Sequence, residues 1–146
     1  MDRKKISIIG AGKVGSTVAQ MVAYKELGDV VLFNRTAGVA KGIALDMEEG
    51  APLASYDVDV KGTGDYKETK NSDVVAITAG LARSPGMSRN DLLFKNAEIV
   101  KGIAKGVARY SPKSIIIVVT NPLDAMVYLT YKITRFPRNR VLGMAG

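Results

Sequence analysis

The sequence contains neither cysteine nor histidine among its 146 residues. Without cysteine, the chain forms no disulfide bond and offers no thiolate to a metal ion, so we expect no metal site. Without histidine, it lacks the side chain that most often serves as a general base near neutral pH. No run of 18 apolar residues is present, so we expect no membrane partner. The short apolar stretch near the N-terminus ends at glycine, which favours a strand over a signal peptide and predicts a cytoplasmic protein.

Basic residues outnumber acidic residues by 21 to 14, which gives a formal net charge of +7. A nucleic-acid interface would gather these charges on one face, but they are spread singly along the chain, with no run longer than 3–5. We therefore expect a solvated surface and no nucleic-acid partner. Positive charge would also favour a phosphate-rich cofactor.

Apolar segments of strand length alternate with segments of helical periodicity, and 47% of the residues are apolar. The predicted strands are 6–9, 30–33, 56–61, 74–78, 115–119 and 140–144. The predicted helices are 13–26, 39–49, 90–109 and 123–134, with a short helical turn at 65–69. This alternation predicts one α/β domain over 1–146 with the doubly wound Rossmann fold. Its six-stranded parallel sheet has the order 3-2-1-4-5-6, with helices on both faces and an edge strand at 56–61.

The first predicted strand runs directly into Gly10, Gly12 and Gly15, in the pattern G-x-G-x-x-G, and a predicted helix follows. Only glycine tolerates both the tight turn and the close approach of the backbone to a pyrophosphate. The helix start, which includes Lys13 and Val14, points free N–H groups and the positive end of the helix dipole at the anion. The motif predicts a dinucleotide site where strands one and four meet. The alternative is that the glycines serve packing alone.

The second predicted strand is followed by Asn34, Arg35 and Thr36, where NAD-binding domains usually carry an acidic residue. Asn34 is neutral, the Arg35 guanidinium can pair with a phosphate, and Thr36 can donate another hydrogen bond. The sequence therefore favours NADP over NAD as the cofactor. The alternative is that Arg35 is a solvated loop residue and that Asn34 still bonds the ribose.

A loop that contains glycine and proline follows the fourth predicted strand and carries Arg83 and Arg89. Gly80, near its start, lets the backbone approach the pyrophosphate or the adenosine ribose. Guanidinium groups bind carboxylates, so a mobile loop with two of them can fold over a small dicarboxylic acid and exclude water. A flexible, charged surface loop is the alternative.

The fifth predicted strand is followed by Asn121, Pro122 and Asp124. Asn121 stands at the end of the sheet where its amide can bond the nicotinamide side of the cofactor or a substrate oxygen. The alternative is a helix-start signal, because Pro122 fits the first helical turn and Asp124 is favourable at the positive helix end. Both interpretations can hold together.

These residues resemble the lactate/malate dehydrogenase family, and more closely its malate dehydrogenases of archaeal and bacterial type. The most specific match is the Arg-x-Pro-Gly-Met-x-Arg loop; the matching segments are 10–15, 44–47, 78–80, 83–89, Asn96, 121–124 and 141–146. The resemblance implies hydride transfer between a nicotinamide cofactor and malate or oxaloacetate. It implies that Arg89 is catalytic and polarises the substrate carbonyl, and that Arg83 selects a dicarboxylic substrate. It further implies that Asn121 orients the nicotinamide and the substrate oxygen.

The cofactor-binding residues that motif and resemblance together imply come from five segments of the chain. They are Gly10, Gly12, Lys13, Val14, Gly15, Asn34, Arg35, Thr36, Thr78, Ala79, Gly80, Asn96, Val119 and Asn121.

In the family, a second domain supplies the catalytic histidine, its aspartate partner and the arginine that clamps the substrate carboxylate. The present sequence carries no histidine. We therefore expect it to bind cofactor with little or no turnover, and we expect the full-length protein to be a homo-oligomer. Two alternatives stay open. One is a stand-alone nucleotide-sensing module, such as the regulatory domain of a potassium channel, in which the arginine loop has no role. The other is lactate dehydrogenase, against which Arg83 argues.

Overall fold

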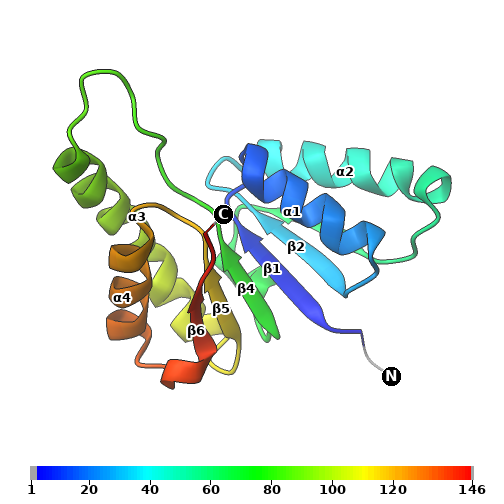
Figure 1. The fold of residues 1–146 in the computed structure, drawn as a ribbon. Coiled ribbons are helices and arrows are strands. Elements are labelled where there is room, and N and C mark those ends of the chain that lie inside the picture. Colours follow the sequence, from blue (N-terminus) through cyan, green and yellow to red (C-terminus); the bar gives the residue numbers. More distant parts are fainter. Residues whose placement is uncertain (1–2, 146) are drawn as a thin grey trace.

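The computed structural model describes residues 3–145 as a single parallel sheet with helices on both of its faces (Figure 1). The strands are β1 (Lys5–Ile9), β2 (Asp29–Phe33), β3 (Val60–Thr63), β4 (Val74–Ile77), β5 (Ile115–Val118) and β6 (Val141–Gly143). The helices are α1 (Lys13–Tyr24), α2 (Ala37–Ala54), α3 (Arg89–Tyr110) and α4 (Leu123–Thr134), with short 3-10 helices η1 (Tyr66–Thr69) and η2 (Arg138–Arg140). Gly146, the last residue of the segments that carry the family resemblance, lies outside the described residues.

The strand order is β3-β2-β1-β4-β5-β6, and each neighbouring pair is parallel. This confirms the predicted Rossmann topology. The chain reverses its direction of progress across the sheet between β1 and β4, and such a switch point opens a crevice at the carboxyl ends of the strands.

Two separate apolar cores cover the two faces of the sheet. Helices α1 and α2 pack on one face and α3 and α4 on the other, as Figure 1 shows. Because side chains alternate along a strand, Ile8 enters the first core and its neighbour Ile9 enters the second. Both are almost fully buried, at 0% and 1% exposure. Central parallel strands buried on both sides explain the continuous apolar runs of the sequence.

The third strand differs from its predicted position, because it runs from Val60 to Thr63 rather than over 56–61. Its partner β2 begins at Asp29, and pairing starts where Val30 meets Val60. Tyr56 and Val58 are buried in the α1–α2 core but have no strand beside them. The alternating sequence pattern therefore reflects burial of side chains at 56–58, and strand pairing begins only at Val60. The structure confirms that this strand lies at the edge of the sheet.

The second helix is longer than predicted and continues past 49 to Ala54, with Pro52 inside its last turn. The sequence Gly50-Ala51-Pro52 is typical of a helix end, but a proline in the last turn forfeits only a single backbone hydrogen bond. Tyr56 hydrogen-bonds the carbonyl of Met47, and Ser55 ends the helix in the left-handed conformation. The helix thus continues past the residues that predicted its end. No helix within residues 3–145 has the length and apolar character needed to cross a membrane.

Candidate functional site

A cavity of about 740 Å³ lies at the carboxyl ends of β1, β2 and β4, at the switch point of the sheet. Its volume is in the range of small-molecule and cofactor sites. Fourteen residues line it: Ile9, Gly10, Gly12, Phe33, Asn34, Arg35, Tyr66, Thr78, Ala79, Gly80, Leu81, Ile99, Gly102 and Ile103. Seven of these are predicted cofactor residues, namely Gly10, Gly12, Asn34, Arg35, Thr78, Ala79 and Gly80.

Gly10 and Gly15 make the turn after β1 possible through contacts within the protein. Gly10 has a φ of +116°, and a Cβ atom there would lie 2.6 Å from the backbone nitrogen of Ala79. A Cβ atom on Gly15 would overlap the carbonyl oxygen of Gly10 and lie 2.7 Å from Thr78 Oγ1. Thr78 donates from that hydroxyl to the Gly10 carbonyl at 3.0 Å. These glycines bring helix α1 close against the ends of β1 and β4.

Gly12 is different, because nothing in the described part of the chain requires a glycine there. Its φ of −80° and ψ of −174° suit any residue, and a Cβ atom would meet no atom within 4 Å. The open space beside Gly12 belongs to the cavity. A residue without a side chain at this point leaves room for a ligand to approach the backbone, which is what a pyrophosphate requires.

The first turn of α1 presents unsatisfied backbone donors at the same place. Gly12 is the N-cap residue and provides no side-chain cap, and the first turn holds no acidic residue. The first amides of a helix have no partner within it, and the helix dipole makes this end positive. Lys13 and Val14 are exposed in this turn, with Val14 at 53%. The donors and the positive potential fit the diphosphate of a dinucleotide.

The end of β2 forms one wall of the cavity, at Asn34 and Arg35. The Asn34 side-chain amide donates to the carbonyl oxygen of Thr36 at 3.2 Å, which leaves its Oδ1 atom as an acceptor. Arg35 is exposed, and within residues 3–145 no hydrogen bond or ion pair holds its guanidinium. Thr36 is the N-cap of α2 but makes no side-chain cap bond and does not line the cavity.

An apolar wall that sequence reasoning missed completes this part of the cavity. Phe33 and Tyr66 stack with ring centroids 4.1 Å apart, and Ile99, Gly102 and Ile103 of α3 line the cavity. Burial raises the pKa of Tyr66 to about 12, because it disfavours the phenolate. A Cβ atom on Gly102 would meet nothing within 4 Å, as at Gly12. We call this wall the apolar slot, and apolar side chains of this kind suit an aromatic base.

Asn96 lies behind the cavity and does not line it. The side chain is 1% exposed and its amide bonds the backbone of Leu81 and Asn121. Val119 is half-buried at the end of β5, and its backbone nitrogen donates to Ile77. Asn121 is exposed at the same edge of the sheet. The structure therefore places Asn96 beneath the residues that follow β4 and β5.

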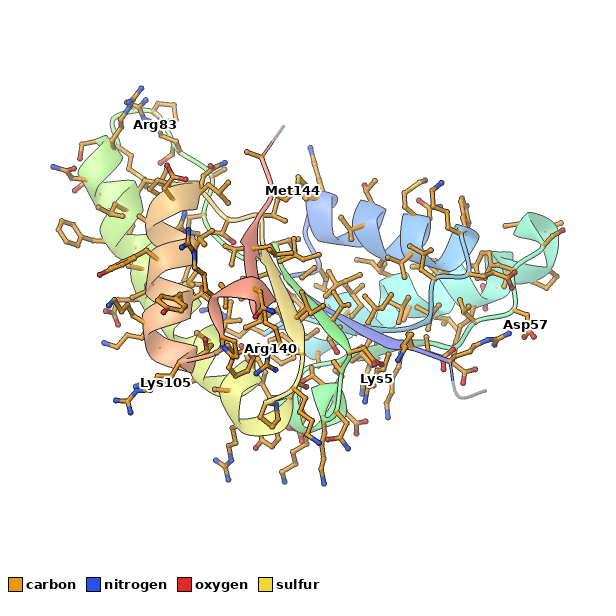
Figure 2. All side chains as sticks on the ribbon, turned by 60° about the horizontal axis from the view of Figure 1, so that its bottom comes forward. Lys5, Asp57, Arg83, Lys105, Arg140 and Met144 are labelled. Carbon is orange, nitrogen blue, oxygen red and sulfur yellow. The ribbon has the colours of Figure 1, made fainter. Side chains whose placement is uncertain are left out.

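The two loop arginines stand farther out. Arg83 is exposed near the tip of the segment between β4 and α3, and its Nε donates to the Met87 carbonyl at 3.0 Å (Figure 2). Arg89 is the exposed first residue of α3. Ser88 and Asp91 form a reciprocal capping box, whose hydrogen bonds from the Ser88 hydroxyl and backbone lower the pKa of Asp91. Neither arginine lines the cavity.

Fold and site together define a dinucleotide-binding Rossmann domain, because the glycine turn, the uncapped helix start and the cavity coincide at the switch point. The family model of the lactate/malate dehydrogenase NAD-binding domain matches residues 4–143. The chain belongs to this family. The part that matches is the domain by which the family binds the NAD cofactor.

Known malate and lactate dehydrogenases match this chain along its whole length. The malate dehydrogenase of Desulforudis audaxviator is 56% identical over 146 residues, which are 100% of this chain and 47% of that protein. The apo structure of Picrophilus torridus malate dehydrogenase is 50% identical with a TM-score of 0.94, and the match covers 99% of this chain and 46% of that one.

A lactate dehydrogenase also matches, in a structure from Cryptosporidium parvum complexed with lactic acid and nicotinamide adenine dinucleotide. It is 42% identical with a TM-score of 0.94, and the match covers 100% of this chain and 46% of that one. The chain thus spans about half the length of the relatives it matches.

Proposed function

We propose that this chain is the cofactor-binding half of an NAD(P)-dependent malate dehydrogenase. The observation that carries the proposal is the coincidence of an unneeded glycine and an uncapped helix start. Gly12 lines the cavity and has open space beside it, and it is also the N-cap residue at the uncapped start of α1. If the start of α1 served stability alone, a serine or aspartate N-cap at position 12 would stabilise the protein more than a glycine does. A bound diphosphate would explain the glycine.

The cavity residues fit a dinucleotide laid across the switch point. The α1 start and the glycine turn would hold the diphosphate, and the slot at Phe33, Tyr66 and Ile99 would hold the adenine. The other half would then extend toward Thr78, Ala79 and the end of β5. When bound, the cofactor supplies the centre that donates or accepts hydride, and the protein residues bind and orient it.

Arg83, Arg89 and Asn121 form the proposed substrate side. Arg89 would polarise the carbonyl of oxaloacetate and Arg83 would bind the distal carboxylate of a dicarboxylic acid. Met87 and Arg83 bond within the loop, and no bond fixes the guanidinium of either arginine to the sheet within residues 3–145. This leaves both arginines available to a substrate. The 146-residue chain should bind cofactor without turnover, since it has no histidine to exchange the substrate proton.

The end of β2 supports a preference for NADP over NAD. Asn34 stands where a carboxylate would repel a 2′-phosphate. Within the described residues 3–145, no hydrogen bond or ion pair holds the Arg35 guanidinium at the cavity wall. The NAD-binding domain of the family sets the expectation of NAD(H) binding, so the NADP preference is an additional proposal about these residues. The ratio of the dissociation constants of NADPH and NADH tests this preference.

Calorimetric titration of the chain with NADPH and with NADH tests both the proposed cofactor binding and the proposed preference for NADP. We expect both to bind and NADPH to bind more tightly. Arg35→Ala should weaken NADPH about tenfold and leave NADH within about twofold, since one phosphate ion pair is lost. Lys105→Ala removes the same charge from the exposed face of α3 and should change neither. Tighter NADH binding by the unaltered chain would remove the NADP preference, and binding of neither cofactor would remove the proposed function.

We also propose that the full-length protein is a homo-oligomer. Large apolar side chains are exposed on three helices, with Leu53 of α2 at 92%, Phe94 of α3 at 69% and Tyr128 of α4 at 62%. Exposed apolar groups on this scale favour association. Sedimentation equilibrium of the full-length protein tests it, and a monomer at micromolar concentration would contradict it.

A further inference from the structure

The buried amide of Asn96 joins two loops that are distant in sequence. Its Oδ1 accepts the backbone N–H of Leu81 at 2.7 Å, and its Nδ2 donates to the carbonyl oxygens of Leu81 at 3.2 Å and Asn121 at 2.7 Å. Leu81 follows β4 and Asn121 follows β5. One side chain from α3 therefore ties the exits of two neighbouring strands together.

A second side chain ties the same two exits. Thr120 Oγ1 donates to the carbonyl oxygens of Ala79 at 2.8 Å and Ile77 at 3.2 Å. The Thr120 methyl group lies 2.5 Å from where a Cβ atom on Gly80 would stand, so the two strands' exits are in close contact. We call residues 79–81 and 119–121 the β4–β5 ledge. Asn96 and Thr120 together determine its shape.

The chemistry at position 96 requires an asparagine. An amide accepts one hydrogen bond and donates two from the same planar group, which matches the three bonds observed. Aspartate would keep the acceptor but place a charge against two carbonyl oxygens, and an apolar residue would leave three backbone groups without partners. The Asn96 side chain is 1% exposed and its three bonds are partly buried, so either substitution would cost stability at the two loops.

The ledge is where the nicotinamide half of the cofactor would rest. The ribose next to the adenine belongs at the end of β2 and the diphosphate at the start of α1, so the remaining half extends past Ala79 and Gly80. We propose that Asn96 is a positioning residue that holds the β4–β5 ledge in register for the nicotinamide half and aligns Asn121 with it. Asn96 itself then makes no contact with the ligand. This inference rests on the proposed function.

The proposal predicts a selective loss of affinity, because ADP-ribose lacks the nicotinamide but keeps the adenine, both riboses and the diphosphate. We expect Asn96→Ala to weaken NADH binding about tenfold while ADP-ribose binding stays within about twofold. Isothermal titration of the 146-residue chain with each ligand gives the two dissociation constants. Thr130→Val is the matched control, since Thr130 is 0% exposed and its hydroxyl bonds the Met126 carbonyl of its own helix, its single side-chain bond among residues 3–145. It should change neither constant.

The thermal unfolding of each variant is measured beside its titrations, so that an unfolded variant is not mistaken for one in which the ledge is mispositioned. If Asn96→Ala does not fold, Thr120→Val takes its place, because it removes the bonds to Ala79 and Ile77 but keeps the methyl contact. It should show the same selectivity at about threefold. Equal weakening of NADH and ADP-ribose binding, or an unchanged NADH affinity in a folded variant, would overturn the positioning role.

If the unaltered chain binds ADP-ribose and NADH equally well, the ledge holds no nicotinamide and the inference fails. If it binds neither ligand nor NADPH, the proposed function fails with it.

Discussion

The two ends of the sheet differ in whether they leave backbone donors and space free for a ligand. At the amino end, serine and threonine groups bond one another in a closed network that includes Ser7, Thr69, Ser72, Ser111 and Ser114. All five are at most 3% exposed. At the carboxyl end, the start of α1 has no side-chain cap, and Gly12 and Gly102 face open space.

Size alone does not distinguish the two ends. A hollow of about 930 Å³ lies at the amino end, lined among others by Lys4, Asp73 and Arg140, and is larger than the cavity at the carboxyl end. Figure 2 labels Arg140. Its acidic group, Asp73, is already occupied by Lys4 Nζ at 3.0 Å and the Lys5 N–H at 2.9 Å. An end whose polar groups satisfy each other serves stability, whereas an end that leaves backbone donors and space free serves a ligand.

Gly15→Ala should have the largest effect, because it disrupts the close packing of α1 against the turn that follows β1. Its methyl group would overlap the Gly10 carbonyl oxygen, which is backbone and cannot move aside. We expect the free energy of unfolding to fall by about 3 kcal/mol or more, with loss of NADH binding. Urea denaturation measures it. A variant as stable as the unaltered chain would show that α1 does not pack this closely on β1.

Gly12→Ser should separate stability from binding at the same turn. A serine N-cap is at least as favourable as glycine, so we expect stability to rise by about 0.3 kcal/mol. The new side chain fills the open space in the cavity, and NADH affinity should fall about 100-fold. Gly42→Ser is the control, since Gly42 also faces open space but lies on the exposed side of α2. Unchanged affinity in Gly12→Ser would contradict the ligand-based reason for this glycine.

Ser72→Ala tests the closed end. It leaves the Ser7 hydroxyl buried without its partner 2.7 Å away, which should cost about 2 kcal/mol of stability. Replacing both Ser7 and Ser72 by alanine should cost less than the sum of the two single changes, because no orphaned hydroxyl remains. Urea midpoints of the four proteins give the coupling. NADH affinity should stay within about twofold throughout, and a larger change would mean that the two ends are not independent.

Tyr66→Phe should have the smallest effect on stability, and this effect should be seen only at high pH. The pKa of Tyr66 is raised from 10.0 to about 12, so its neutral phenol stabilises the folded state fully below pH 10. Stability is then lost as the pH rises toward 12, because the unfolded chain ionises first. The ring is partly exposed, so we expect a loss of roughly 1 kcal/mol that Tyr66→Phe lacks. Urea midpoints across this pH range test it, with the exposed Tyr128→Phe as control.

Local patterns predicted the sheet well where strands are buried on both faces. The apolar runs at β1, β4 and β5 and the glycine turn predicted the topology, and the strand order is confirmed. The pattern at 56–61 reported burial correctly but not pairing, because the point where pairing begins depends on the start of β2. Helix α2 likewise continues past its predicted end to Ala54, because a proline in the last turn forfeits only a single backbone hydrogen bond.

The predicted site was less complete for a related reason. Glycines and the arginine loop carry a signal in consecutive residues, whereas the apolar slot combines Phe33, Tyr66 and a face of α3 from three separate segments. Ile99, Gly102 and Ile103 recur at helical spacing, but the same spacing describes an ordinary core face. Asn96 was predicted to bind cofactor, and the structure shows its amide bonded to the backbone of two loops.

By itself, the sequence determined the order of strands and helices and the position of the glycine-rich turn after β1, because both depend on neighbouring residues and on the steric freedom of glycine. Only the tertiary structure decided which glycine faces the protein and which faces empty space. It also decided that Asn96 supports the β4–β5 ledge from behind. These features depend on distances between segments that are far apart in the chain, and no local pattern encodes such distances.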